Sequence, residues 1–282
     1  MSNRVVNGIK MPYVGFGTAD LCGDVKEIVK NAIQVGYTLI DTASVYGSEQ
    51  MIGEAVEELI LQKRIKREQL IIQSKLDPNR NGYEQTLECF AESLDNLKTN
   101  YLDVYFIHWP VPRGNEENYK EKNIDTWKAF EKLYKDGKVR AIGVCNFLER
   151  HILQIEKECQ IPPMITQLEL HPGYQQRGLV NFCKERGMFI EAWSPMGRGI
   201  LNKEPFIEMA ENYDKNIGQL ALRWGIEKGY MPITRTSSKE HATTNLDLLN
   251  FSINKDDMKL LDDLNTNDGY DKIWSYKRQQ MY

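Results

Sequence analysis

Residues 35–49 read Val-Gly-Tyr-Thr-Leu-Ile-Asp-Thr-Ala-Ser-Val-Tyr-Gly-Ser-Glu, and they contain one complete structural signal. Gly36 suits the left-handed cap that closes a helix. Leu39–Thr42 is a short apolar run typical of a buried strand, and a helical period with one apolar face begins at Ser48. This stretch therefore predicts the end of one helix, a strand, and the start of the next helix.

The same alternation occurs eight times along the chain. We expect strands at Tyr13–Gly17, Leu39–Thr42, Leu70–Lys75, Val104–His108, Ala141–Cys145, Ile165–Leu168, Phe189–Trp193 and Pro232–Thr234. We expect helices at Val25–Val35, Ser48–Gln62, Glu84–Leu97, Thr126–Tyr134, Glu149–Glu158, Leu179–Arg186, Ile217–Glu227 and Lys239–Leu249. Eight successive β-α units predict a parallel sheet, and eight is the number that closes a (β/α)8 TIM barrel.

Two further elements lie outside these eight units. Asn7-Gly8 between the apolar residues of Val5–Lys10 predicts an N-terminal β-hairpin, which we expect to plug the bottom of the barrel. Residues Asn254–Leu264 predict an extra C-terminal helix, whereas the long polar stretch Pro110–Asn123 is interpreted as an exposed loop. No low-complexity linker interrupts the chain, so residues 1–282 are expected to form a single α/β domain.

Composition narrows the class of protein. Of the 282 residues 41% are hydrophobic, enough for a sizeable core, and the net charge of −4 is too mild to indicate nucleic acid or a membrane surface as a partner. Five scattered cysteines without a CxxC pair argue against a metal site or a disulfide framework. The start of the chain lacks the apolar stretch of a signal peptide. A cytoplasmic protein with no obligate protein partner is expected.

Polar residues follow three neighbouring predicted strands. Asp41 ends the second strand and Tyr46 lies in the loop after it, Lys75 ends the third, and His108 ends the fourth. Barrel enzymes carry their chemistry at the carboxyl ends of the strands. Because charges at the end of an apolar strand are costly unless they are paired, Asp41 and Lys75 are expected to form an ion pair.

This set of residues predicts proton transfer. A free phenol has a pKa near ~10 and is a weak acid at neutral pH. A lysine ammonium nearby would lower the pKa of Tyr46, and Asp41 would orient Lys75 and keep it charged. Tyr46 would then protonate an oxygen as hydride arrives at the adjoining carbon, while His108 hydrogen-bonds the same oxygen.

Each of these residues also has a plain structural interpretation. Asp41 could cap the following turn, Lys75 could extend to solvent, and His108 could be a core histidine with satisfied hydrogen bonds. Tyr46 could be a surface aromatic residue in a loop. The catalytic interpretation is favoured because all four residues fall at one rim of the barrel by strand position alone.

Several segments that contain these residues resemble the aldo-keto reductase family. They are Gly36–Ala43 (GYTLIDTA), Tyr46–Glu49 (YGSE), Ser74–Leu76 (SKL), Asp103–Pro110 (DVYFIHWP), Gly143–Phe147 (GVCNF), Gln167–Pro172 (QLELHP) and Trp193–Gly197 (WSPMG). The likeness extends from about Val5 to Ile253. The short tail resembles bacterial-type members, such as the group of 2,5-diketo-gluconate and aldehyde reductases.

The resemblance implies a barrel that binds NADP(H) without a GxGxxG motif. Use of NAD(H) as well is expected because residues near the 2′-phosphate depart from the family pattern. It implies a catalytic tetrad of Asp41, Tyr46, Lys75 and His108, and a carbonyl substrate held by Tyr46, His108 and Trp109. It implies that Trp193 stacks on the nicotinamide ring and that Cys145, Asn146 and Gln167 hold its carboxamide. The full set of implied cofactor residues is Gly17, Thr18, Asp41, Cys145, Asn146, Gln167, Trp193, Ser194, Met196, Gly197, Arg235, Thr236, His241 and Asn245.

Four positions depart from the family pattern. Cys145 stands where the family usually has serine, and Ala19 replaces a tryptophan of the substrate pocket. His241 stands where an arginine usually grips the 2′-phosphate, and Thr244 replaces a frequent glutamate near the adenine. A histidine carries only part of a positive charge at neutral pH. A strong preference for NADPH over NADH is therefore not expected.

Two other functions compete with carbonyl reduction. A nicotinamide-nucleotide-sensing module would bind the cofactor with weak catalysis. A barrel lyase or isomerase would use Lys75 as a Schiff-base nucleophile. Substrate choice is expected to depend on the loops Ala19–Asp24 and Pro110–Asn123 and on the tail from Asp268, which includes Trp274 and Tyr276.

Overall fold

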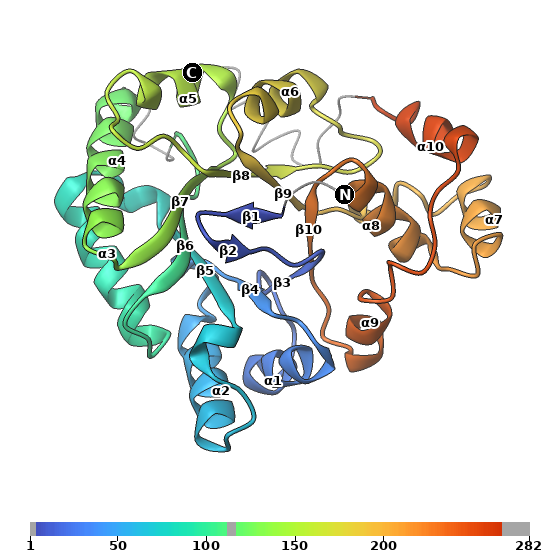
Figure 1. Ribbon diagram of the computed structural model, residues 1–282, viewed down its shortest axis with the longest axis horizontal. Helices are drawn as coiled ribbons and strands as arrows, with labels where there is room; N and C mark the ends of the chain where they lie inside the picture. The colour runs from blue at the N-terminus through green and yellow to red at the C-terminus, as the bar shows by residue number, and fades with distance from the viewer. Residues whose placement is uncertain (1–3, 112–116, 267–282) are drawn as a thin grey trace.

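Eight parallel strands form a closed barrel in the computed structural model, which describes residues 4–111 and 117–266 (Figure 1). Around the barrel the strands follow the order β10, β3, β4, β5, β6, β7, β8 and β9, and the first and last of the eight along the chain, β3 and β10, are hydrogen-bonded to each other. The predicted (β/α)8 fold is confirmed.

The strands of the barrel are β3 (Gly15–Gly17), β4 (Leu39–Asp41), β5 (Ile71–Leu76), β6 (Leu102–Ile107), β7 (Val139–Cys145), β8 (Ile165–Glu169), β9 (Phe189–Trp193) and β10 (Met231–Thr234). The helices are α1 (Val25–Val35), α2 (Glu49–Leu61), α3 (Tyr83–Asn96), α4 (Tyr119–Lys135), α5 (Glu149–Glu156), α6 (Arg177–Glu185), α7 (Phe206–Glu211), α8 (Ile217–Glu227), α9 (Lys239–Thr244) and α10 (Lys255–Asp262). None of these helices is both long and apolar enough to cross a membrane in the described part of the chain.

An antiparallel hairpin closes the amino-terminal end of the barrel. Its strands β1 (Val5–Val6) and β2 (Ile9–Lys10) are joined by Asn7 and Gly8, whose φ angles of 44° and 78° suit a two-residue hairpin turn. Val6 and Ile9 pack in one apolar cluster with the barrel interior, and Figure 1 shows the hairpin lying across the barrel. The predicted plug is therefore confirmed.

Alternation along the strands decides which side chains enter the barrel. In β4, Leu39 packs with the interior cluster and Ile40 packs with the outer cluster beneath the helices. Because side chains alternate along a strand, Asp41 returns to the interior. The same alternation after Ile165 and Phe189 brings Gln167 and Glu191 into a polar layer above the apolar plug.

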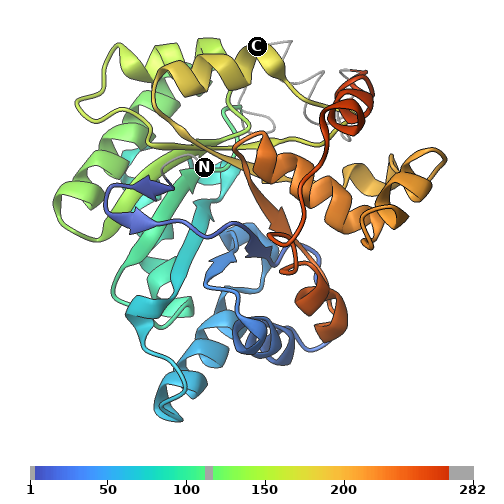
Figure 2. The ribbon, with the colours of Figure 1, turned by 45° about the vertical axis from the view of Figure 1, so that its right-hand side comes forward.

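Several element boundaries differ from the sequence prediction. Helix α4 begins at Tyr119, seven residues before the predicted Thr126, so residues 119–123 belong to a helix and not to a loop. The polar sequence of residues 119–123 does not predict the buried face of the helix. On that face the Asn123 amide donates to the Pro110 carbonyl at 2.8 Å. Helix α9 ends at Thr244 and not at Leu249, and α7 was not predicted; it lies beside α8 at the edge of the molecule (Figures 1 and 2). The extra helix α10 is confirmed, whereas the tail from Asp268 lies outside the described residues.

Replacing Gly53 with alanine is expected to destabilise the fold. An added Cβ would lie 2.3 Å from the Asn96 carbonyl oxygen and 2.7 Å from the Leu97 carbonyl carbon, and backbone atoms cannot turn aside as a side chain can. We expect a loss of about 2–4 kcal/mol in the free energy of unfolding, measured by urea denaturation.

The control is Gly225→Ala in helix α8, where an added Cβ meets nothing within 4 Å. That variant is expected to gain about 0.5–1 kcal/mol because alanine favours a helix interior more than glycine does. Equal stability of the two variants would contradict the close approach of α2 to the end of α3.

Candidate active site

The candidate catalytic residues lie at the ends of three neighbouring strands or in the short connections that follow them. Asp41 ends β4, Lys75 lies in β5, and His108 directly follows β6. After β4 the chain forms one turn of 3-10 helix, Ser44–Tyr46, which ends at Gly47 with a φ of 68°. The four residues that the sequence placed at one rim therefore lie together at the carboxyl end of the barrel.

Asp41 and Lys75 form the expected ion pair. The Lys75 ammonium donates to both carboxylate oxygens of Asp41 at 2.7 and 2.8 Å and to the Thr42 carbonyl at 3.0 Å. Burial alone would lower the pKa of this fully buried lysine, but Asp41, together with weaker effects of Tyr46 and Cys145, offsets burial and the pKa is raised. Lys75 is therefore held as a cation, and its three hydrogen bonds match the three protons of an ammonium group.

Tyr46 differs from the sequence-based expectation in its acidity. The Lys75 ammonium lies 5.1 Å from the centroid of the phenol ring and favours the phenolate. Burial of the hydroxyl, however, outweighs that attraction and raises the pKa of Tyr46 to about 12. The expected lowering of this pKa was wrong, because desolvation disfavours the charged form more than one paired cation favours it. Tyr46 thus keeps its proton at neutral pH.

His108 faces Tyr46 across the pocket. Its Nε2 lies 3.4 Å from the Tyr46 hydroxyl, and the two rings meet edge to face with centroids 5.6 Å apart. Burial and the neighbouring Lys75 cation hold the pKa of His108 well below its usual range. The imidazole is therefore neutral and can offer one N–H donor to an oxygen in the pocket.

These residues open into a cavity of about 450 Å³. Twelve of the residues predicted for catalysis, cofactor or substrate line it: Gly17, Asp41, Tyr46, His108, Trp109, Cys145, Asn146, Gln167, Trp193, Ser194, Met196 and Arg235. Six further residues line the cavity but are not among the predicted site residues: Ala19, Asp20, Pro195, Arg198, Ile233 and Thr234. Arg198 had a possible signal, since it lies between two glycines in the loop after β9.

Hydrogen bonds order the floor of this cavity. The Trp193 indole N–H donates to the Asn146 side-chain oxygen at 2.9 Å, and the Asn146 amide donates to the His108 carbonyl at 3.0 Å. The same amide also approaches the Cys145 sulfur at 3.2 Å, and the Cys145 thiol lies 3.7 Å from the Gln167 side-chain oxygen. Three strands, β7, β8 and β9, are thus linked through side chains that face the cavity.

The remaining predicted residues lie around the cavity and do not line it. Lys75 is buried beneath it, and the Thr18 hydroxyl donates to the Asp41 carbonyl at 3.0 Å. Gly197, with a φ of 53°, lies against the His171 ring. Thr236 precedes α9 and His241 lies within that helix and is exposed, whereas Asn245 follows the helix and is buried.

Arg235 links two loops at the mouth of the cavity. Its guanidinium donates to the Ala19 carbonyl at 2.8 Å and to the Asp20 carbonyl at 3.2 Å, and it lies 3.4 Å from the Asp20 carboxylate. This side chain is half exposed, so its contacts are of the kind that a stronger anion can displace.

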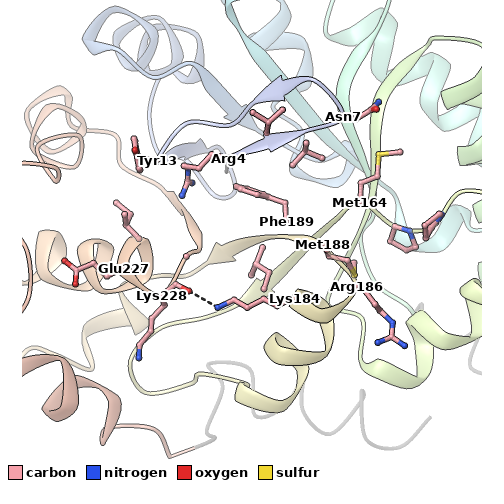
Figure 3. A pocket seen from close by; sticks show the side chains of 18 of the residues that line it. Arg4, Asn7, Tyr13, Met164, Lys184, Arg186, Met188, Phe189, Glu227 and Lys228 are labelled. Carbon is pink, nitrogen blue, oxygen red and sulfur yellow. Dashed lines mark hydrogen bonds between the residues drawn. The ribbon is translucent and has the colours of Figure 1, made fainter. Parts of the chain in front are cut away.

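A larger cavity of about 970 Å³ lies at the opposite end of the barrel, beside the hairpin (Figure 3). Its described lining contains basic side chains and one carboxylate, Glu227, which already accepts hydrogen bonds from Arg223 at 2.7 Å and from the Ile253 amide at 3.0 Å. The Lys184 ammonium is likewise engaged, by the Lys228 carbonyl at 3.0 Å (Figure 3). The larger volume of this second cavity therefore does not mark it as the catalytic site.

Sequence comparison matches residues 14–266 to the Aldo/keto reductase family. The chain is 39% identical over 265 residues to glyoxal reductase from Bacillus subtilis, which covers 93% of this chain and 92% of the relative. Among solved structures, the aldose reductase from Schistosoma japonicum has a TM-score of 0.89 at 31% identity, covering 98% of this chain and 96% of that one. An aldo-keto reductase from Bombyx mori in complex with NADP has a TM-score of 0.85 at 28% identity, covering 96% and 94%. A family match across most of the chain, relatives of nearly equal length and the shared barrel agree, and the protein belongs to the aldo/keto reductase family.

Proposed function

We propose that the protein is an NAD(P)H-dependent oxidoreductase that reduces aldehydes or ketones to alcohols, with Tyr46 as the general acid. One observation carries this proposal. A protonated phenol and a neutral imidazole, 3.4 Å apart, face the same cavity, and a buried ion pair lies beside the phenol. That arrangement suits an oxygen that gains negative charge.

The nicotinamide ring, when bound, supplies the hydride that is added to the carbonyl carbon. Tyr46 then gives its proton to the carbonyl oxygen, and the neutral imidazole of His108 donates a hydrogen bond that orients that oxygen. Lys75 stabilises the phenolate that remains on Tyr46, and Asp41 keeps Lys75 charged and in place. The pKa of about 12 for Tyr46 keeps the acid protonated before each reaction.

The cavity residues suit such a cofactor. The indole of Trp193 is fixed by its hydrogen bond to Asn146, which makes it a rigid platform for a planar ring. Side-chain oxygen, amide and thiol groups of Gln167, Asn146 and Cys145 lie beside it and match the donors and acceptors of a carboxamide. We propose that Gly17, Thr18, Ser194, Met196 and Gly197 lie along the rest of the cofactor and that Arg235, Thr236, His241 and Asn245 surround its adenosine end.

Other parts of the proposal concern the whole chain. Residues 1–282 act as one domain in the cytoplasm on a small carbonyl compound, without nucleic acid, a membrane or an obligate protein partner. Trp109, which lines the cavity beside His108, contacts the substrate.

Consumption of NADPH with a reactive aromatic aldehyde, followed by absorbance, tests the proposal. Cofactor binding with no turnover over a broad panel of carbonyl compounds would favour the nucleotide-sensing alternative. The Schiff-base alternative requires an uncharged lysine, whereas Lys75 donates to Asp41 and Thr42 and its pKa is raised. We therefore expect no borohydride-trapped adduct on Lys75.

Replacing His241 with arginine is expected to tighten binding of NADPH but not of NADH. An arginine at this exposed position would present a permanent charge and a forked donor to a 2′-phosphate. We expect the Kd for NADPH to fall about fivefold, equivalent to roughly 1 kcal/mol at a solvent-exposed site. Quenching of tryptophan fluorescence measures both constants, and equal tightening for NADH would exclude a 2′-phosphate site at this helix.

A further inference from the structure

Strand β9 carries a carboxylate in its middle that does not line the candidate cavity. Glu191 is fully buried and is paired in register with Gln167 of β8 and Met231 of β10. No ion pair reaches this carboxylate within residues 4–111 and 117–266. A buried charge without a cation is costly, so a specific role for Glu191 must be sought in its hydrogen bonds.

Two glutamine amides join Glu191 to the catalytic layer. The Gln167 side-chain nitrogen donates to Glu191 Oε2 at 2.8 Å and to Asp41 Oδ1 at 2.9 Å. The Gln73 side-chain nitrogen donates to the same two oxygens, each at 2.8 Å. Two carboxylates are thus bridged by two amides across four strands, and Asp41 Oδ1 also accepts from Lys75 at 2.7 Å.

This pattern uses all the donors of Gln167. An amide nitrogen has two protons, and Asp41 and Glu191 accept one each. Gln167 lines the cavity, whereas Gln73 and Glu191 do not. Its side-chain oxygen, which the Cys145 thiol approaches at 3.7 Å, can accept a second hydrogen bond from a ligand. If Glu191 did not accept a hydrogen bond, Asp41 would be the only acceptor for the Gln167 amide and one amide proton would have no partner. The amide could then turn and present its nitrogen to the cavity.

The protonation of Glu191 is compatible with this role. Burial and the neighbouring Asp41 carboxylate raise the pKa of Glu191 to about 7, against the lowering effects of Gln167, Gln73 and Lys75. Cys145 and Arg4 are the other ionisable groups that interact with it electrostatically. Glu191 Oε1 has no hydrogen-bond partner among the described residues and can carry the proton while Oε2 still accepts from both amides.

We propose that Glu191 is a positioning residue, which fixes the Gln167 amide with its oxygen toward the cavity so that this oxygen accepts a hydrogen bond from the carboxamide of a nicotinamide. The inference rests on the proposed function, because it concerns how the nicotinamide end of the cofactor is held. It predicts that Glu191 affects binding of the nicotinamide and leaves binding of the adenosine end unchanged.

The test compares two ligands that differ in the nicotinamide, NADPH and 2′-phospho-ADP-ribose, by calorimetric titration. In Glu191→Met the acceptor is lost, and we expect the Kd for NADPH to rise about tenfold while that for 2′-phospho-ADP-ribose changes less than about twofold. In Glu191→Gln the side-chain oxygen can still accept from both amides, and we expect rescue to within about threefold of wild type.

Two further variants serve as a replacement for Glu191→Met and as a control. Glu191→Thr, which introduces a shorter polar side chain of a type common in strands, is expected to show the same ligand-selective loss should the methionine variant not fold. Glu131→Met removes another buried carboxylate, one that accepts from the amides of Gln160 and Ile161 outside the barrel, and is expected to leave the ratio of the two Kd values unchanged.

The outcomes separate the two proposals. Equal weakening of both ligands, or unchanged NADPH binding in Glu191→Met and Glu191→Thr, would overturn the positioning role while leaving the proposed function intact. Wild-type protein that binds neither ligand would overturn the proposed function, and the role of Glu191 with it.

Discussion

Replacing Tyr46 with phenylalanine is expected to lower kcat for carbonyl reduction by about a thousandfold, the usual effect of removing a positioned general acid. The ring remains, so its contact with His108 and the shape of the cavity persist. The Kd for the cofactor should therefore change little. Stopped-flow and steady-state assays with an aromatic aldehyde, together with a cofactor titration, measure both quantities.

Tyr105→Phe is the matched control. Tyr105 is also buried and lies three residues from His108, but its ring packs against Phe90 and Phe130 beneath the helices and not in the cavity. Its kcat is expected to match wild type. Undiminished turnover in Tyr46→Phe would exclude the phenol as the proton donor.

The pKa of about 12 for Tyr46 also sets the direction of the pH dependence. Reduction needs the protonated phenol, which is present at all pH values well below that pKa. We therefore expect no loss of reduction due to Tyr46 between about pH 6 and 9, whereas oxidation of an alcohol needs the phenolate and should rise with pH across that range. A fall in reduction rate near pH 8 in wild type that is absent from Tyr46→Phe would contradict the raised pKa.

Replacing Lys75 with methionine is expected to damage both stability and catalysis. The substitution leaves the buried Asp41 carboxylate beside Glu191 with no cation. Breaking a buried pair by removing one partner costs about 3–5 kcal/mol, which chemical denaturation would detect directly. Reduction should also slow, because the phenolate of Tyr46 loses the cation that stabilises it.

The double variant Lys75→Met, Asp41→Asn is the control for this prediction. It removes the unpaired charge, so it is expected to be more stable than Lys75→Met alone, though equally inactive. Equal losses of stability in the single and the double variant would show that packing and not charge is responsible.

The sequence predicted most of what depends on strand order. The apolar runs predicted the eight strands of the barrel. The positions of Asp41, Lys75 and His108 at strand ends predicted that these residues lie together at its carboxyl end. The start of α4 was wrong because its exposed face is charged, and only packing shows that Asn123 is buried. The acidity of Tyr46 was also wrong, since it depends on how deeply the hydroxyl is buried, which residue order does not specify.

Glu191 was missed, although the sequence held a sign of it. A carboxylate in the middle of an otherwise apolar strand is unusual enough to be examined. Its hydrogen bonds to Gln73 and Gln167, however, join residues far apart in the chain. Such contacts follow from the alternation of side chains in a closed barrel, and they become visible only when neighbouring strands are in register.

The bridged carboxylates have a consequence for how the chain reaches its native state. Asp41 and Lys75 come from the first half of the barrel, whereas Gln167 and Glu191 come from the second half. A folding intermediate with only the first half formed would contain Asp41 without the Gln167 amide and Gln73 without the Glu191 carboxylate, and buried polar groups that lack partners are unfavourable. The hydrogen-bonded layer of Asp41, Gln73, Gln167 and Glu191 therefore makes a half-formed barrel less stable, and it favours assembly of the two halves in one cooperative step.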